Sequence, residues 1–290
     1  MNIKSFFLIT WFVLNNFISF SQVNLLVPKG NLFIIGGGDR TPELINALFK
    51  TAVLSSKDYI AVLPMSSEYA DTSYYYIKAD LETACTNTIA NLNFTKDKLK
   101  DKKWIDSLKN ARLIFITGGD QSRFMNLVLH SPVYGAIHYA YANGATIAGT
   151  SAGAAMMSKN MITGKELLGD TIYYSTFRKL QQNNIDLQEG LGLIDSVILD
   201  QHFVARSRYN RLISAIAKFP GYTCIGIDEA TAIIVHGNKV TVTGESQVVV
   251  MSDPQNLAIK DGLIKMSDLR FSIYTSGDVF FLNNGGNKSQ

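Results

Sequence analysis

The sequence predicts an α/β fold with a mainly parallel, doubly wound sheet. Three observations support this prediction. Short apolar runs alternate with helical segments, most of these runs end in glycine-rich or polar loops, and the 290 residues are 47% hydrophobic and 18% charged. Continuous apolar runs are typical of parallel strands buried on both faces, and their alternation with helices is typical of doubly wound sheets. A chain of this length can bury a substantial core.

The first half of the chain shows the alternation most clearly. Thr41 is the expected N-cap of the first helix, and Pro42 opens it. Pro64 ends the strand at 59–63, and Asn143-Gly144 ends the helix at 133–142. We predict strands at 31–35, 59–63, 88–94, 112–117 and 145–148, and helices at 43–53, 73–85, 101–109, 122–129 and 133–142.

The second half continues the pattern and then departs from it. Strands are predicted at 194–199 and 223–227, with a helix at 206–217 between them. Short alternating segments at 232–235, 239–242 and 247–251, separated by glycine and asparagine turns, predict a C-terminal antiparallel β extension over about 231–282. With neither a repeat nor a low-complexity linker, residues 22–290 are predicted to form a single domain.

The N-terminus has the pattern of a secretory signal peptide. Lys4 precedes an apolar run over 6–20, and the small residues Ser19 and Ser21 stand at the positions that a signal peptidase reads. A membrane anchor is the alternative, but the run is shorter than the roughly 18 residues that a span requires. We expect residues 1–21 to be removed and the protein to be secreted or periplasmic.

Charge and cysteine content narrow the possible partners. The net charge is +3, and lysine and arginine do not cluster, so nothing indicates a nucleic-acid partner. Cys85 and Cys224 are the only cysteines, which excludes a disulfide scaffold and a paired-cysteine zinc motif. We expect both to be buried free thiols.

The unusual loops all follow predicted strands. They are residues 36–39, residues 118–121, the turn at Ser151, residues 200–202 and residues 228–229. In open α/β sheets, ligands bind beyond the carboxyl ends of the strands. We therefore expect these five segments to meet on one rim and to form the functional site.

Residues 149–153, Gly-Thr-Ser-Ala-Gly, have the G-x-S-x-G pattern of a nucleophile elbow. An apolar strand precedes Ser151 and a helical segment follows it, which is the context that the motif needs. A tight turn would project the Ser151 hydroxyl above the sheet, and the Ala152 N–H could donate to an oxyanion. Ser151 is therefore predicted to be a catalytic nucleophile.

A serine nucleophile needs a base and an acid. Of the four histidines, only His202 follows a strand end, so it is the predicted base. Glu229 follows another strand end and is the first choice for the acid that orients His202, and Asp228 is the second.

Two further groups could contribute to the site. Arg206, Arg208 and Arg211 follow His202 on one predicted helix, either as a solvated basic face or as a clamp for substrate carboxylates. The glycines at 36–38 lack the G-x-G-x-x-G spacing of a dinucleotide site. They could leave room for substrate or supply a second oxyanion N–H, for which Gly37 is our choice.

These motifs together resemble the cyanophycinases of serine peptidase family S51, which also contains aspartyl dipeptidase. The resemblance covers roughly residues 30–250. It rests on residues 118–121 (Gly-Gly-Asp-Gln), residues 149–155 (Gly-Thr-Ser-Ala-Gly-Ala-Ala), residues 200–203 (Asp-Gln-His-Phe), Arg206 and Arg211. It implies a flavodoxin-like fold related to class I glutamine amidotransferases, usually as a homodimer.

The resemblance also implies an activity, hydrolysis of cyanophycin (multi-L-arginyl-poly-L-aspartate) to β-Asp-Arg dipeptides without a metal or cofactor. By motif, Ser151 would be the nucleophile, His202 the base and Glu229 the acid. The positions that match the family's substrate pocket are Gln121, Asp200, Gln201, Arg206 and Arg211.

Alternatives remain open at this point. The aspartyl dipeptidase branch takes its acid from between serine and histidine, which would make Asp170 or Asp186 a rival to Glu229. Residues 165–190 form a long polar segment whose contribution to the pocket the resemblance does not specify. The second candidate function is an aspartyl or isoaspartyl dipeptidase, and the third is a non-catalytic secreted binding protein.

Overall fold

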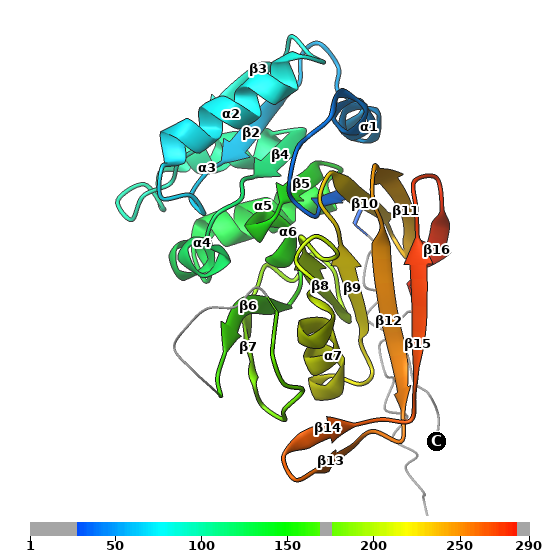
Figure 1. The fold of residues 1–290 in the computed structure, drawn as a ribbon. Coiled ribbons are helices and arrows are strands. Elements are labelled where there is room, and N and C mark those ends of the chain that lie inside the picture. Colours follow the sequence, from blue (N-terminus) through cyan, green and yellow to red (C-terminus); the bar gives the residue numbers. More distant parts are fainter. Residues whose placement is uncertain (1–27, 169–175, 283–290) are drawn as a thin grey trace, which may run out of the picture.

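The computed structural model describes residues 28–168 and 176–282 (Figure 1). The predicted signal peptide and Asp170 lie outside the described residues. Within the described part of the chain, no helix is both long enough and apolar enough to cross a membrane.

An eight-stranded sheet forms the larger part of the molecule. Five strands run parallel, and three antiparallel strands continue from β1 to the opposite edge. The parallel strands, in spatial order, are β1 (Leu32–Ile35), β5 (Thr146–Thr150), β4 (Leu113–Ile116), β2 (Tyr59–Leu63) and β3 (Thr88–Asn91). The antiparallel strands are β10 (Thr231–His236), β11 (Lys239–Gly244) and β16 (Val279–Phe281).

Helices cover both faces of the parallel part. Successive residues of a strand point to opposite faces, so Phe33 and Ile35 pack with one set of helices, and Leu32 and Ile34 with the other. The first set is α1 (Pro42–Ala52) and α2 (Ala70–Glu82), and the second is α3 (Lys102–Asn110), α4 (Gln121–Val128) and α5 (Pro132–Ala142). The expected mixed α/β architecture with a large, mainly parallel sheet is thus confirmed.

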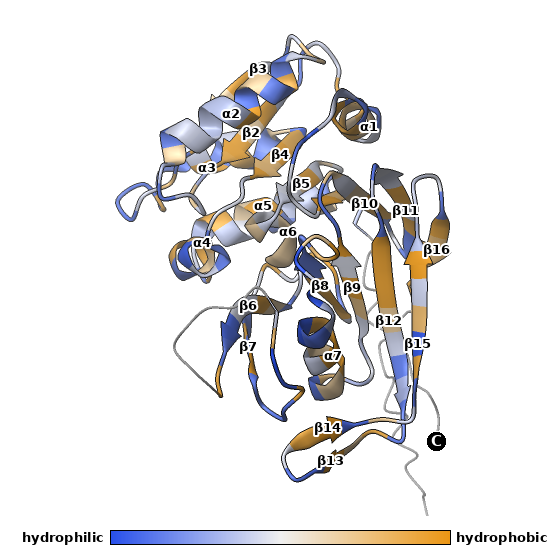
Figure 2. Ribbon diagram, viewed as in Figure 1, coloured by the Kyte–Doolittle hydropathy of each residue, from blue (hydrophilic) through white to orange (hydrophobic). Residues whose placement is uncertain are grey.

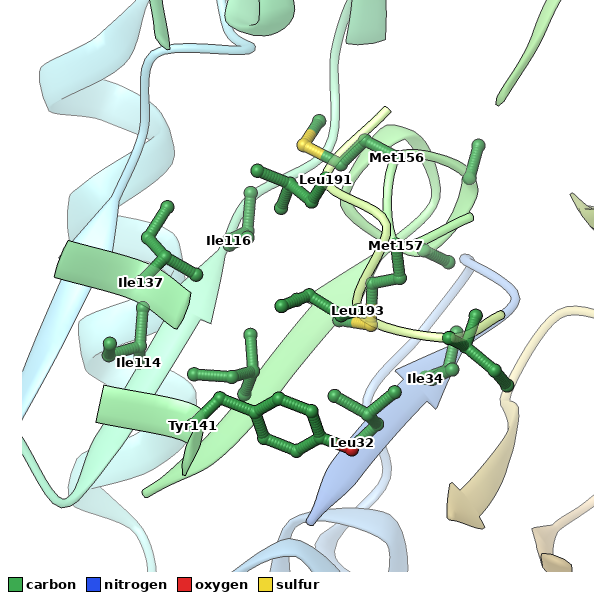
Figure 3. Close-up of a cluster of buried hydrophobic side chains, with 14 of the residues drawn as sticks. Leu32, Ile34, Ile114, Ile116, Ile137, Tyr141, Met156, Met157, Leu191 and Leu193 are labelled. Atoms are coloured by element: carbon green, nitrogen blue, oxygen red, sulfur yellow. The ribbon is translucent and has the colours of Figure 1, made fainter. Parts of the chain in front are cut away.

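The two cores contain mainly branched aliphatic and aromatic side chains. Strands such as β2 are hydrophobic along most of their length (Figure 2). Figure 3 shows part of the core, in which Ile114 and Ile116 of β4 lie close to Ile137 of α5. Burial of this apolar surface is the main favourable term in folding.

A second sheet of four strands differs from the single-sheet expectation. β8 (Val197–Gln201) runs parallel to β9 (Thr223–Ile227), and β12 (Val248–Gln255) and β15 (Asp268–Tyr274) continue the sheet antiparallel. One face joins the core of the large sheet, and the other is covered by α7 (Tyr209–Lys218). The apolar pattern predicted β8, β9 and β12 but not β15, and it contained no information on which sheet each strand would join.

Several predicted boundaries move in the structure. α2 begins at Ala70, three residues before its predicted start. The predicted helix at 206–217 begins only at Tyr209, because Ser207 has a left-handed φ of 50° that interrupts helical geometry. Arg206 and Arg208 therefore lie in the turn before α7, and the prediction that they share one helix with Arg211 was wrong.

Two hairpins were not predicted. β6 (Asn160–Glu166) pairs with β7 (Ile185–Glu189), partly within the polar segment that the resemblance left unassigned. β13 (Ala258–Lys260) pairs with β14 (Leu263–Lys265). The structure confirms the Thr41 cap, whose hydroxyl accepts from the Leu44 N–H. It also confirms that Cys85 and Cys224 are free, but Cys85 is only partly buried, so the prediction of burial was wrong for that residue.

Candidate active site

Ser151 occupies a strained turn between β5 and the short helix α6 (Ala152–Ala155). Its backbone has φ 54° and ψ −112°, outside the regions that L-residues favour. Such a conformation costs about 1–3 kcal/mol and persists only where the surroundings enforce it. The Ser151 N–H donates to the Ile35 carbonyl of β1 at 3.0 Å, which ties the turn to the neighbouring strand.

The two glycines of the elbow are required by close packing. A Cβ atom at Gly149 would lie 2.5 Å from the Gly153 carbonyl oxygen, and one at Gly153 would lie 2.4 Å from the Ile116 carbonyl oxygen. Real Cβ atoms do not approach backbone so closely. The G-x-S-x-G pattern therefore reflects how closely strand and helix approach at Ser151.

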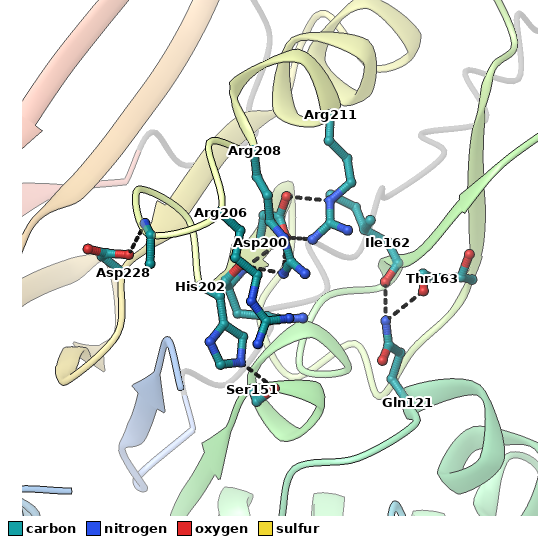
Figure 4. A network of polar contacts seen from close by, with 12 residues as sticks. Gln121, Ser151, Ile162, Thr163, Asp200, His202, Arg206, Arg208, Arg211 and Asp228 are labelled. Carbon is teal, nitrogen blue, oxygen red and sulfur yellow. Dashed lines mark hydrogen bonds and ion pairs between the residues drawn. The ribbon is translucent and has the colours of Figure 1, made fainter. Parts of the chain in front are cut away.

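The structure brings together Ser151, His202 and Glu229 from three different strand ends. Ser151 follows β5 of the large sheet, and the other two follow β8 and β9 of the second sheet. His202 Nε2 lies 2.9 Å from Ser151 Oγ, and His202 Nδ1 lies 2.5 Å from Glu229 Oε1. Figure 4 shows the His202 ring pointing at the serine. This geometry is that of a nucleophile, a base and an orienting acid.

The other candidate acids are engaged elsewhere. The Asp228 carboxylate accepts from the Ala205 N–H at 2.8 Å and from the Ser246 hydroxyl at 2.6 Å. Asp186 accepts from the Thr163 hydroxyl at 2.8 Å. Among the described residues, Glu229 is thus the carboxylate bound to the His202 ring.

The surroundings of His202 favour its neutral form. Burial lowers the pKa of the imidazole below its ordinary value of 6.5, because the charged form loses hydration. The hydrogen bond and the negative charge of Glu229 act in the opposite direction, and the positive charges of Arg206 and Arg208 add to the lowering. A neutral imidazole near pH 7 can accept a proton from serine.

The glycines at 36–38 make room for the base and its acid. A Cβ atom at Gly37 would lie 2.3 Å from the His202 ring, and one at Gly38 would lie 2.7 Å from the Glu229 Cβ. The Gly36 carbonyl accepts from the His202 N–H at 2.7 Å. The predicted space at these glycines is therefore filled, at least in part, by the protein's own catalytic candidates.

Asp200 and Arg211 form a buried ion pair. Arg211 donates from Nε to one carboxylate oxygen at 2.7 Å and from Nη2 to the other. Arg208 Nη1 lies 3.8 Å from the same carboxylate and donates to the Gln201 carbonyl at 2.6 Å (Figure 4). Asp200 and Arg211 thus satisfy each other's charge, and substrate binding by either stays a prediction.

The remaining predicted substrate residues differ in accessibility. Gln121 is buried and donates from Nε2 to the Ile162 and Thr163 carbonyls of β6, at 2.8 and 3.0 Å. Gln201 is also buried, and its side-chain oxygen has no hydrogen-bond partner in the described part of the chain. The Arg206 side chain is 43% exposed, with Nε 4.0 Å from Glu229 Oε1. Arg206 is therefore the most accessible charge of the predicted set.

A pocket of about 280 Å³ opens beside Ser151 and His202. Besides these two residues and Gly37, its lining includes Arg40, Ser73, Tyr76, Gly118 and Thr150. Gly118 and Thr150 belong to segments that the sequence singled out, whereas Arg40, Ser73 and Tyr76 were given no role. The position of Gly118 after a strand end was the available signal, and its Cβ would lie 3.8 Å from Ser151 Oγ. No local pattern pointed to Arg40, Ser73 or Tyr76.

Comparisons with known proteins place this geometry in a family. The family model described as peptidase family S51 matches residues 32–243. A protein of Trichormus variabilis named cyanophycinase is 33% identical over 267 residues, which cover 88% of this chain and 86% of that protein. A cyanophycinase of Synechococcus elongatus is 31% identical, with coverage of 88% and 80%.

Solved structures share the fold at low sequence identity. A peptidase from an acI-B1 actinobacterium has a TM-score of 0.63 and 18% identity, with coverage of 89% of this chain and 98% of that one. A putative peptidase E protein from Listeria monocytogenes has a TM-score of 0.51 and 18% identity, with coverage of 75% and 99%. The fold of these structures agrees with the family match, and the chain belongs to peptidase family S51, as a serine-type peptidase.

Proposed function

We propose that this protein is a cyanophycinase-like serine exopeptidase, which hydrolyses cyanophycin and releases β-Asp-Arg dipeptides. The observation that carries the proposal is the hydrogen-bonded chain from Ser151 through His202 to Glu229, in a chain 33% identical to a protein named cyanophycinase. The substrate would be a polypeptide rich in aspartate and arginine, and the chemistry would require no metal or cofactor.

The geometry supports an acyl-enzyme mechanism. Ser151 Oγ attacks the backbone carbonyl of a β-arginylated aspartate while His202 Nε2 accepts the hydroxyl proton. Glu229 stabilises the imidazolium that forms. The carbon–nitrogen bond then breaks as His202 returns the proton to the leaving amine, and water, activated by the same imidazole, hydrolyses the acyl-enzyme.

Backbone N–H groups would stabilise the negative charge on the attacked carbonyl oxygen. The proposed donors are Ala152, which follows the nucleophile directly, and Gly37, which lines the pocket. Gly118 is a third pocket-lining residue whose backbone lies close to Ser151.

Recognition of the substrate is proposed to involve the polar residues beside His202. Arg206 is exposed and can bind a substrate carboxylate. The unpartnered side-chain oxygen of Gln201 can accept from a guanidinium. Asp200, Arg211 and Gln121 would contribute only where substrate displaces their present partners, because each is already bonded within the protein.

Two further proposals accompany this function. The first is a homodimer, which is supported by exposed apolar side chains on the edge strands β15 and β16, among them Phe271, Ile273 and Phe281. The second is a flavodoxin-like relationship to class I glutamine amidotransferases, which is supported by five parallel strands with helices on both faces.

Replacement of Ser151 tests the proposed function. Wild-type protein incubated with insoluble cyanophycin should release β-Asp-Arg, which mass spectrometry of the soluble fraction would identify. Ser151→Ala should lower turnover by up to about a million-fold, because the nucleophile is lost while the fold remains. A fluorophosphonate should label the wild-type protein at Ser151.

The outcomes separate the candidate functions. If no β-Asp-Arg is released and the protein cleaves aspartyl or isoaspartyl dipeptides, its substrate is a dipeptide and not the polymer. Absence of fluorophosphonate labelling would favour a non-catalytic binding protein. Substantial cyanophycin digestion by Ser151→Ala would overturn the mechanism.

The environment of His202 predicts the pH dependence of catalysis. His202 must be neutral to accept the proton and its pKa lies below 6.5, so kcat/KM should rise with pH, with a midpoint below 6.5. Arg206→Gln removes a cation that lowers this pKa, so its midpoint should move to higher pH. Glu229→Gln removes contacts that raise the pKa, so its midpoint should move to lower pH at a reduced maximal rate.

The profiles would be measured with a soluble cyanophycin fragment, and stability over the pH range would be checked by circular dichroism. A wild-type midpoint above 6.5, or a downward shift in Arg206→Gln, would contradict the assignment of His202 as the base.

The N-terminal sequence supports a proposal on location. We expect export with removal of residues 1–21, because a charged residue, an apolar run and small residues follow one another in the order of a signal peptide. Expression of the full chain in a bacterial host, followed by N-terminal sequencing of the exported protein, should give a start at Gln22. Retention in the membrane with an intact N-terminus would indicate an anchor instead.

A further inference from the structure

The pocket beside Ser151 has one permanently charged residue in its lining. Arg40 holds that position, and among the described residues no carboxylate lines the pocket, although Asp80 pairs with Arg40 from outside the lining. A guanidinium in a pocket without an acidic residue favours an anionic ligand group.

Arg40 is held in place by its neighbours. Its Nε donates to Asp80 Oδ2 of α2 at 2.6 Å, and its Nη1 contacts the Gly38 carbonyl at 3.4 Å. A guanidinium has five N–H donors, and these two contacts use two of them. The others remain for a ligand, and the side chain is only 19% exposed. Arg40 is thus a preorganised donor, with Asp80 as its positioning residue.

Thr150 provides a second, independent indication of a polar ligand. Thr150 is among the residues that line the same pocket and is 5% exposed, and its buried hydroxyl has no hydrogen-bond partner in the described part of the chain. Buried hydroxyls are rarely left without a partner. A bound oxyanion group that reaches into the pocket would accept from this hydroxyl.

The position of the loop that carries Arg40 indicates which part of the substrate the pocket receives. Gly37 of that loop packs against the His202 ring. His202 must protonate the leaving amine, so the leaving part of the substrate lies on the His202 side of the broken bond. In an exopeptidase that acts at the C-terminus, this leaving part is the terminal β-Asp-Arg, and its aspartate carries a free main-chain α-carboxylate that no inner unit has.

We propose that Arg40 binds the terminal α-carboxylate of the leaving dipeptide, with Thr150 as a second donor. This inference rests on the proposed function and specifies how the site selects a chain end. The pocket of about 280 Å³ lies beside Ser151 and His202, where the leaving unit would bind. Selection of the free carboxylate therefore makes the enzyme act from the end of the chain.

The test compares two synthetic substrates. Each contains two β-Asp-Arg units joined by an α-peptide bond. In one substrate the C-terminal aspartate has a free main-chain α-carboxylate, and in the other this group is a carboxamide. Wild-type kcat/KM should be about 10- to 100-fold higher for the acid, as expected for a hydrogen bond between charged groups. In Arg40→Gln this ratio should fall towards one, mainly through a higher KM for the acid.

Matched variants make the result specific. Lys78→Gln removes a positive charge from α2, the helix that carries Asp80, at a residue outside the pocket lining, and should keep the wild-type ratio. Asp80→Asn should reduce the ratio partly, because Arg40 keeps its charge but loses its support. Arg40→Lys should restore part of the preference that Arg40→Gln loses. Fluorophosphonate labelling of Ser151 in every variant reports whether the catalytic residues are assembled.

The outcomes distinguish this inference from the proposed function. Equal wild-type efficiency for acid and amide, or an unchanged ratio in Arg40→Gln, overturns the role of Arg40 and leaves the peptidase assignment intact. Cleavage of neither substrate by a wild-type protein that is labelled at Ser151 overturns the proposed function and this inference together.

Discussion

Close contact between a glycine loop and two strand ends makes the active site possible. Gly36, Gly37 and Gly38 follow β1 of the large sheet, whereas His202 and Glu229 follow strands of the second sheet. A Cβ atom at any of the three glycines would lie within 2.7 Å of an atom in the residues that follow β8 or β9. Only residues without side chains let the two sheets approach closely enough for His202 to reach Ser151.

Two stabilising arrangements hold the catalytic groups once the sheets meet. The strained backbone of Ser151 is held by its hydrogen bond to β1 and by the packing of Gly149 and Gly153. The strand end before His202 is held by the buried pair of Asp200 and Arg211. Removal of one partner of such a pair costs about 3–5 kcal/mol, because the remaining charge is buried alone. Residues that resemble substrate contacts in the sequence therefore also support the base.

Much of this could be predicted from the sequence, because the signals were local. The elbow can be recognised by its glycine spacing, and His202 and Glu229 can be recognised as polar residues shortly after the apolar part of a strand. The partition into two sheets could not be predicted, because β8 and β9 contain short buried apolar runs like those of the large sheet, and their partners are set by packing between distant segments. The turn at Ser207 was not predicted, because a serine in the sequence does not indicate a left-handed φ. Arg40 was missed because its partner, Asp80, lies forty residues away in the chain.

The glycine loop lets the second sheet bring His202 close enough to Ser151 to act as its base. The most direct test is the rate of fluorophosphonate labelling of Ser151 in Gly37→Ala, with circular dichroism and thermal unfolding as measures of the fold. The control is Gly135→Ala, because a Cβ at Gly135 of α5 would meet nothing within 4 Å. Gly37→Ala should fold but label far more slowly than wild type, and Gly135→Ala should label at the wild-type rate. Labelling of Gly37→Ala at the wild-type rate would contradict this role of the glycine loop.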